Sequence, residues 1–161
     1  MQHWKVLFVK PRTEKKVSEY CELYGIHYYL PLRQKVRIVQ RRKITVNTPV
    51  FPGYVFVRLF PAQRLPMLQT NLLVRILEPL SPRKMLRDLV MVRRVLRINP
   101  QSLTTQTLTA GKLVRITAGP FMGVEGRITR ITPKTKVVLN VDMIGQAISV
   151  EIEADFINVL D

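Results

Sequence analysis

The chain has 161 residues, 47% of them hydrophobic and 23% charged, and its formal net charge is +15 at pH 7. This composition is typical of a globular protein and excludes a disordered tail. No apolar run approaches the roughly 18 residues of a membrane span, and the single cysteine, Cys21, excludes an internal disulfide and a cysteine-based zinc site. Because the first residues also lack the pattern of a secretion signal, we expect a soluble protein of the reducing cytoplasm.

The positive charge is confined to the N-terminal part of the chain. Residues 1–100 carry 20 Lys and Arg against 5 Asp and Glu, whereas residues 101–161 carry 6 of each. A surplus of this size attracts polyanions. Uneven charge between two parts of a chain also indicates modules with different partners. We therefore expect the N-terminal module to bind nucleic acid.

The chain begins with a predicted strand and helix. Residues 3–10 form an apolar run that predicts a buried strand. Thr13 then offers an N-cap, and Gly25 is a suitable C-terminal stop. Between them, apolar side chains recur at the helical spacing i, i+3, i+4, i+7, at Val17, Tyr20, Cys21 and Tyr24. A second short strand is predicted over 27–32.

Residues 33–47 alternate strictly between polar or charged and apolar side chains, which predicts a hairpin with one apolar face and one polar, solvent-exposed face. The turn is expected around 39–42, although no glycine lies there. The hairpin has six cations and no acidic residue: Arg33, Lys35, Arg37, Arg41, Arg42 and Lys43. Such groups either contact phosphates, with salt-dependent affinity, or form a solvated face. The sequence leaves both interpretations open.

Further along, the pattern predicts a turn at 51–53, an aromatic strand over 54–57, a weak helix after Pro61 that Pro66 interrupts, and a strand over 72–77. Ser81-Pro82 starts a helix that ends at Asn99-Pro100. Its apolar face consists of Met85, Leu89, Val92 and Leu96. The opposite face carries an arginine stripe, either solvated or in contact with nucleic acid, made of Arg83, Arg87, Arg94 and Arg97.

The C-terminal part has a different character. Residues 98–110 are uncharged and rich in Thr, Gln and Ser, which predicts a linker. After it come five short β-branched segments separated by turn signals, over 113–117, 126–132, 137–143, 147–152 and 157–160. Five short strands in so few residues predict a small closed barrel.

Two stretches are specific beyond composition. Trp4 in the first strand, followed by Phe51-Pro52-Gly53-Tyr54-Val55-Phe56-Val57, resembles the N-terminal domain of NusG-type transcription elongation factors. Gly111-Lys112-Leu113-Val114-Arg115-Ile116 and Gly119-Pro120-Phe121-Met122-Gly123-Val124-Glu125-Gly126 resemble the KOW motif. The resemblance covers nearly the whole chain in the expected order. Within the family, the length and the basic N-terminal part look more like the specialised paralogues, such as RfaH.

The resemblance implies an α+β protein of two domains. A ferredoxin-like α/β sandwich (1–98) would be joined by a linker (99–110) to an SH3-like β-barrel, the KOW domain (111–161). In the family, the N-terminal domain binds the clamp helices of RNA polymerase through an apolar patch. By motif position this role falls on Phe8, Phe51, Tyr54 and Phe56. The competing interpretation is that these aromatics belong to the core; strand alternation places Tyr54 and Phe56 on one face and the intervening valines on the other.

The resemblance also implies contact with the non-template DNA strand and the upstream duplex. The expected nucleic-acid-binding residues are Lys10, Arg12, Lys16, Arg37, Arg41, Arg42 and Lys43. In the family, the KOW barrel binds a small-subunit ribosomal protein or the Rho terminator. We assign partner contact there to Phe121, which packing in the barrel would explain equally, and to Ile144. Because Ile144 stands where the family has a partner-binding aromatic, coupling to Rho or the ribosome is left open.

The expected function is that of an elongation and antitermination factor, monomeric and without cofactor or metal, that suppresses pausing and termination. An enzyme would need a reactive group. Cys21 and His27 are the only nucleophile–base pair to consider, and Cys21 lies on the apolar helix face, where thiols are inert. The alternative function is a ribosome-associated RNA-binding protein that uses its KOW barrel on ribosomal RNA. The zero net charge of residues 101–161 argues against it.

Overall fold

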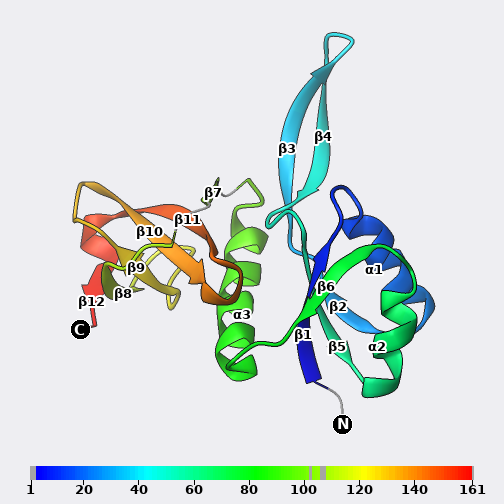
Figure 1. The fold of residues 1–161 in the computed structure, drawn as a ribbon. Helices are drawn as coiled ribbons and strands as arrows, with labels where there is room; N and C mark the ends of the chain where they lie inside the picture. Colours follow the sequence, from blue (N-terminus) through cyan, green and yellow to red (C-terminus); the bar gives the residue numbers. More distant parts are fainter. Residues whose placement is uncertain (1–2, 102, 106–107, 161) are drawn as a thin grey trace. The chain divides into compact units, whose positions relative to one another are not determined.

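The computed structural model describes residues 3–101, 103–105 and 108–160, and Figure 1 shows the order of their elements. The elements up to residue 98 are β1 (His3–Val9), α1 (Glu14–Leu23), β2 (His27–Tyr29), β3 (Leu32–Val39), β4 (Arg42–Pro49), β5 (Tyr54–Leu59), α2 (Pro61–Leu68), β6 (Leu73–Leu77) and α3 (Pro82–Ile98). They are followed by β7 (Leu103–Thr105), β8 (Lys112–Ile116), β9 (Glu125–Ile128), β10 (Lys134–Val141), β11 (Gln146–Glu153) and β12 (Ile157–Val159), with short 3-10 helices over Asp142–Ile144 and Ala154–Phe156.

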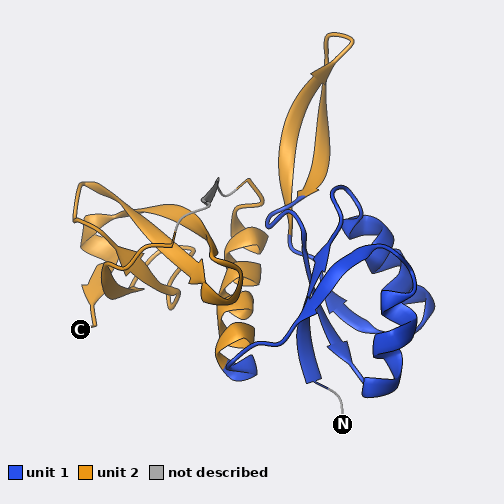
Figure 2. Ribbon diagram, in the orientation of Figure 1, with its two compact units in different colours: residues 1–31, 49–83 blue, residues 32–48, 84–161 orange. Residues whose placement is uncertain are grey.

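The chain divides into two compact units (Figure 2). The first consists of residues up to 31 together with 49–83, and the second of residues 32–48 together with 84–161. In the first unit, four strands form an antiparallel sheet in the order β2-β5-β1-β6. With α1 after β1 and α2 after β5, this is the β-α-β-β-α-β arrangement of ferredoxin-like folds. The predicted fold class is confirmed.

One face of this sheet is covered by α1 and α2. The buried side chains alternate along the strands because successive residues point to opposite faces. The core on this face includes Leu7, Val9, Val17, Cys21, Val55, Val57 and Met67. The helices thus cover the valines of the aromatic strand, on the face opposite Tyr54, and the predicted apolar position of Cys21 is confirmed.

The turn between β1 and α1 is fixed by hydrogen bonds rather than by the expected side-chain cap. Thr13 precedes the helix, but its hydroxyl donates to the carbonyl of Lys10 (2.7 Å) and makes no bond to the first helical turn. The Lys10 amide in turn donates to the carbonyl of Leu72 (2.9 Å). These bonds tie the start of α1 to β1 and to the segment that enters β6.

The second unit contains the β3–β4 ribbon, helix α3 and a six-stranded antiparallel sheet in the order β12-β8-β9-β10-β11-β7, called here the C-terminal sheet. The expectation of short strands in this region is confirmed. Gly126 shows why a glycine is needed in β9, since an added Cβ would lie 2.7 Å from Val137 Cγ1 and 2.8 Å from the carbonyl oxygen of Val138. Helix α3 buries its predicted apolar face and exposes its arginine stripe.

Part of the predicted linker is structured. Residues 103–105 form β7, which pairs with Ala147–Ser149 of β11; residues 102 and 106–107 lie outside the described residues. Further along, the Asn140 side chain accepts a hydrogen bond from the Thr109 amide (3.0 Å) and donates one to the Thr109 carbonyl (2.7 Å). The side-chain amide of Asn140 thereby makes the same pair of hydrogen bonds to the Thr109 backbone that a neighbouring strand would make. Among the described residues, no helix has both the length and the apolar character that crossing a membrane requires.

Candidate functional site

Two aromatic rings lie together on the first unit's sheet. Phe8 of β1 pairs with Tyr54 of β5 on one side and with Arg75 of β6 on the other. Cross-strand partners share a face, and the Phe8 and Tyr54 ring centroids are 5.3 Å apart, with the Arg75 guanidinium carbon 6.0 Å from the Phe8 centroid. Both rings are half-buried and Arg75 is exposed. We call these three residues the aromatic surface.

Gly53 holds the aromatic surface in place. It has φ of +90°, which side chains other than glycine rarely adopt. An added Cβ would lie 3.3 Å from Phe8 Cε2, tighter than ordinary contact. The Gly53 carbonyl accepts a hydrogen bond from the Val9 amide (2.8 Å), so the loop before β5 lies close against the end of β1.

The other two aromatics of the predicted patch are buried. Phe51 is 1% exposed and Phe56 is 0% exposed. Phe51 lies in the turn before β5, where its carbonyl accepts from the Tyr54 amide (3.2 Å), and Phe56 pairs with Val6 across the sheet. In this conformation both side chains are therefore core, and the exposed part of the predicted patch consists of Phe8 and Tyr54.

The predicted basic residues form two groups. Lys10, Arg12 and Lys16 are exposed at the turn between β1 and α1, in the first unit. Arg12 adopts φ of +61° there. The second group lies on the β3–β4 ribbon, which belongs to the other unit.

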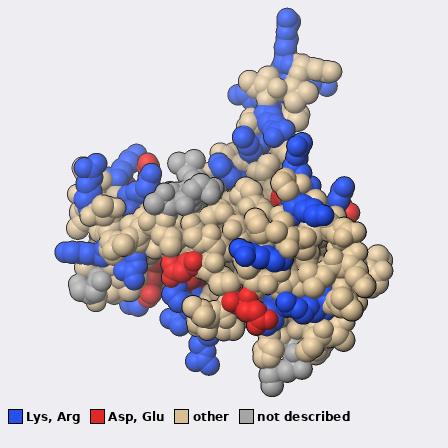
Figure 3. Space-filling model, viewed as in Figure 1, with Lys and Arg blue, Asp and Glu red and all other residues tan. Residues whose placement is uncertain are grey.

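The ribbon is exposed on both faces. Every residue from 34 to 45 is exposed, including Ile38 at 74% and Ile44 at 41%. The expectation of one apolar face is therefore wrong. The two-residue turn between Val39 and Arg42 implies that odd-numbered residues of β3 pair with even-numbered residues of β4, for example Arg37 with Ile44, so that cations and apolar side chains share the same faces. Figure 3 shows Lys and Arg side chains along the ribbon up to its tip.

The predicted partner residues of the C-terminal sheet differ in exposure. Phe121 is half-buried in the loop between β8 and β9, where its carbonyl accepts from the Val124 amide (3.0 Å). It lines a cleft of about 340 Å³. The other lining residues are Asn99, Gln101, Lys136, Ser149, Val150 and Glu151. Ile144 is buried at 8% exposure, so its side chain packs inside in this conformation.

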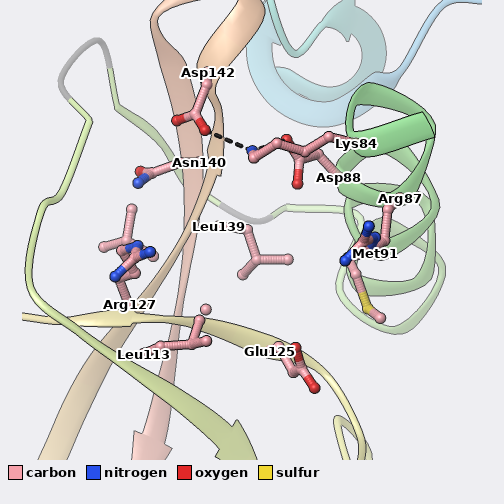
Figure 4. Close-up of a pocket in the computed structure, with 12 residues that line it drawn as sticks. Lys84, Arg87, Asp88, Met91, Leu113, Glu125, Arg127, Leu139, Asn140 and Asp142 are labelled. Carbon is pink, nitrogen blue, oxygen red and sulfur yellow. Dashed lines mark hydrogen bonds and ion pairs between the residues drawn. The ribbon is translucent and has the colours of Figure 1, made fainter. Parts of the chain in front are cut away.

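A second cleft of the same unit, about 230 Å³, lies between α3 and the C-terminal sheet (Figure 4). Lys84 Nζ is 2.5 Å from Asp142 Oδ2 and 3.0 Å from Asp88 Oδ2. Burial lowers the pKa of Lys84, but its hydrogen bonds to the two carboxylates outweigh this and raise the pKa above its usual value. Burial raises the pKa of Asp88. Opposite charges pair here, so this cleft has the character of an ion-pair cluster.

The one thiol of the chain is unreactive in its surroundings. Cys21 is fully buried, and burial, followed by the charge of Glu22, raises the pKa of the thiol to about 11. Little thiolate is present at neutral pH, and thiolate is the nucleophilic form. His27, its expected partner, is exposed. Within the described ranges, no cluster of His, Cys, Asp and Glu could hold a metal ion.

The sequence comparisons agree with this architecture. The family model described as transcription termination factor nusG matches residues 2–108, and the KOW motif model matches residues 110–140. The chain belongs to the NusG family. The NusG and KOW regions together identify a transcription elongation factor; members of the NusG family bind RNA polymerase and are not enzymes.

One solved structure of a NusG protein is consistent with the fold. The structure of Thermotoga maritima NusG has 20% sequence identity and a TM-score of 0.56, and the alignment covers 100% of this chain and 98% of that one. One chain of the MjSpt4:Spt5 complex has 14% identity over 98% of both chains, but a TM-score of only 0.32, which is too low to support an argument about the fold. At this identity the first likeness concerns the fold alone.

Two features of the site escaped the sequence reasoning. Arg75 was absent from the predicted patch, because only the register between β1 and β6 places it opposite Phe8. The left-handed backbone of Gln40 and Arg41 was also not predicted, because turns of this type usually contain Asn or Gly and neither occurs here. The available indication of a tight turn was the alternation over 33–47, which predicts two strands and leaves little room for a loop between them.

Proposed function

We propose that this NusG-family protein binds the clamp helices of RNA polymerase through the aromatic surface. The observation that carries the proposal is the close, half-exposed pair of Phe8 and Tyr54, whose rings are tilted by 34°, with Arg75 beside it. Tyr and Arg dominate the energetics of protein interfaces, especially at their centres. Phe51 and Phe56 support this surface from the core.

The basic residues extend the contact to DNA. Lys10, Arg12 and Lys16 at the β1–α1 turn, and the cations of the ribbon, would contact the phosphates of the non-template strand and the upstream duplex. Bound across the main cleft, the protein would help keep the clamp closed and so suppress pausing and termination. It performs no chemistry itself and acts as a monomer in the cytoplasm.

The proposed division of labour follows the predicted domains. Residues 1–98 hold polymerase and DNA, residues 99–110 connect, and residues 111–161 recruit a further protein. The cleft beside Phe121 supports a role for the KOW region in protein binding. A small-subunit ribosomal protein or Rho is the partner class that the family suggests, and Ile144 would contribute only if the surrounding packing opens.

The test is polymerase binding by a Phe8→Ala/Tyr54→Ala variant. Truncating an interface-centre aromatic costs about 2 kcal/mol or more, and the losses of two neighbouring rings do not simply add. We therefore expect affinity for RNA polymerase to fall by at least about 30-fold. Tyr24→Ala is the matched control, because Tyr24 is a 60% exposed tyrosine of the same unit, outside the aromatic surface. Unchanged affinity of the double variant, or an equal loss in the control, would refute the proposal.

The alternative, a ribosome-associated KOW protein, is disfavoured by charge in the C-terminal sheet. Lys134 lies opposite Glu153, and Lys136 opposite Glu151, between β10 and β11. Cations paired with carboxylates in this way leave little net charge to attract RNA. Co-purification separates the two functions: recovery with RNA polymerase supports the proposal, and recovery with ribosomal subunits alone supports the alternative.

A further inference from the structure

The turn at the end of the β3–β4 ribbon has an unusual backbone. It consists of Gln40 and Arg41, whose φ angles are 48° and 63°. Positive φ at both central residues is the type I′ turn of two-residue hairpins, in which Asn and Gly are strongly preferred. Long side chains adopt this region only at an energetic cost, and strain of this kind clusters at functional sites. The needs of the turn therefore do not explain why Gln and Arg, rather than Asn and Gly, occupy these two positions.

The two side chains share a chemical property. The amide of Gln pairs in bidentate fashion with adenine, and the guanidinium of Arg with guanine, at the base edges of the major groove. Both Gln40 and Arg41 are exposed at the tip of the ribbon. The tip thus presents two of the side chains best suited to read DNA bases.

The form of the ribbon fits the groove of B-form DNA. Each strand has eight residues, which corresponds to a length of about 26 Å. The major groove is about 12 Å wide and admits a two-stranded ribbon. Since every residue from 34 to 45 is exposed, the outer part of the ribbon can enter a groove without unfolding.

The charges of the ribbon suit the walls of the groove. The two-residue turn implies that Val39 pairs with Arg42, which places Lys43 on one face of the ribbon and the other strand cations on the opposite face: Arg33, Lys35, Arg37 and Arg42. A ribbon that enters tip first meets one phosphate backbone with each face. No acidic residue occurs between 32 and 49, so nothing in the ribbon repels those backbones.

Two other nucleic acids fit the ribbon less well. Proteins that hold single strands stack the bases on aromatic side chains, and residues 32–49 contain no aromatic residue. Double-stranded RNA has a deep and narrow major groove that side chains cannot read. Both arguments favour duplex DNA.

We propose that the β3–β4 ribbon reads duplex DNA, with Gln40 and Arg41 on base edges of the major groove and the cations beside them on the phosphates. This inference rests on the DNA contact of the proposed function and adds that the ribbon reads the base sequence of the duplex. It depends on free DNA alone, so it can fail or succeed independently of polymerase binding.

The experiment is selection of duplexes from a random pool by the full chain, followed by fluorescence anisotropy. We expect a selected duplex to bind better than its scrambled counterpart by about 5- to 150-fold for each base pair that is read. The variant Gln40→Gly/Arg41→Gly installs a Gly-Gly pair, which the type I′ turn also prefers, so the ribbon stays folded. Because neither side chain that could read a base remains, this variant should abolish the preference. In the control Arg42→Gln, affinity should fall equally for both duplexes, with a salt slope smaller by about 0.9 and the preference retained.

Three results would overturn the proposal. The first is a pool from which no sequence is enriched. The second is a tip variant that weakens binding to all duplexes equally, which would reduce Gln40 and Arg41 to phosphate contacts. The third is tighter binding of single-stranded DNA or of an RNA duplex than of the selected DNA.

Discussion

Replacing Gly53 by alanine tests how the aromatic surface is held. The substitution places a side chain on a residue with φ of +90° and brings its Cβ to 3.3 Å from Phe8 Cε2. Gly25→Ala is the matched control, because Gly25 belongs to the same unit and has φ of +66°, but an added Cβ meets nothing within 4 Å. Comparison of the two variants separates backbone strain from displacement of Phe8.

The expected magnitudes differ accordingly. A side chain in the left-handed region costs about 1–2 kcal/mol, which is the whole effect expected for Gly25→Ala. For Gly53→Ala we expect about 2–3 kcal/mol, since its φ lies further from the left-handed optimum near 57° and the Phe8 ring must move. With an m-value of about 1–3 kcal/mol/M for a small domain, the urea midpoint should fall by roughly 1 M or more.

Trp4 makes the measurement specific to the first unit. It is the only tryptophan of the chain and lies in β1, so urea unfolding followed by tryptophan fluorescence reports this unit. In parallel, affinity for RNA polymerase should fall for Gly53→Ala and stay unchanged for Gly25→Ala under native conditions. Equal destabilisation and equal affinity in the two variants would refute the claim that Gly53 positions Phe8.

Three further predictions concern other parts of the chain. The Cys21 thiol, with a pKa raised to about 11 by burial, should resist a thiol reagent at pH 8 in the native protein and react at once in urea. A hydrogen bond and the charge of Lys5 lower the pKa of Glu78 in the native protein. The stability that Glu78 contributes should therefore be complete above pH 4.5 and be lost as pH falls through the lower native pKa. In unfolding curves followed by Trp fluorescence, Glu78→Gln should remove this pH dependence of stability. Asn140→Ala deletes both bonds to Thr109, which should cost about 1–3 kcal/mol and abolish protection of the Thr109 amide from hydrogen exchange, whereas Asn140→Asp should have a smaller effect.

Much of the fold could be predicted because local patterns and global packing agree. The helical spacing of Val17 and Cys21 and the alternation of Val55 and Val57 both point to the core that the structure contains. Periodicity says which face is buried, and for these elements one face is buried almost completely. The β-branched runs after residue 111 likewise gave the strands of the C-terminal sheet.

The candidate site could be predicted only in part, because exposure and register depend on partners far away in sequence. Alternation placed Phe56 on the same face as Tyr54, but could not tell that Phe56 is buried and Tyr54 half-exposed. Arg75 became visible only through the pairing of β6 with β1. In the ribbon, the pairing across the turn decides which residues of β3 and β4 share a face, and alternation along a single strand carries no information about that.

The most direct test of the proposed function is a crosslink from position 54. A photoreactive phenylalanine analogue replacing Tyr54 should crosslink to the clamp helices of RNA polymerase in an elongation complex. The same analogue at Leu23, which is 76% exposed in the same unit, should give no crosslink to these helices. Crosslinks from position 54 to another part of polymerase, or none while the protein remains bound, would contradict the proposal that the aromatic surface is the polymerase-binding site.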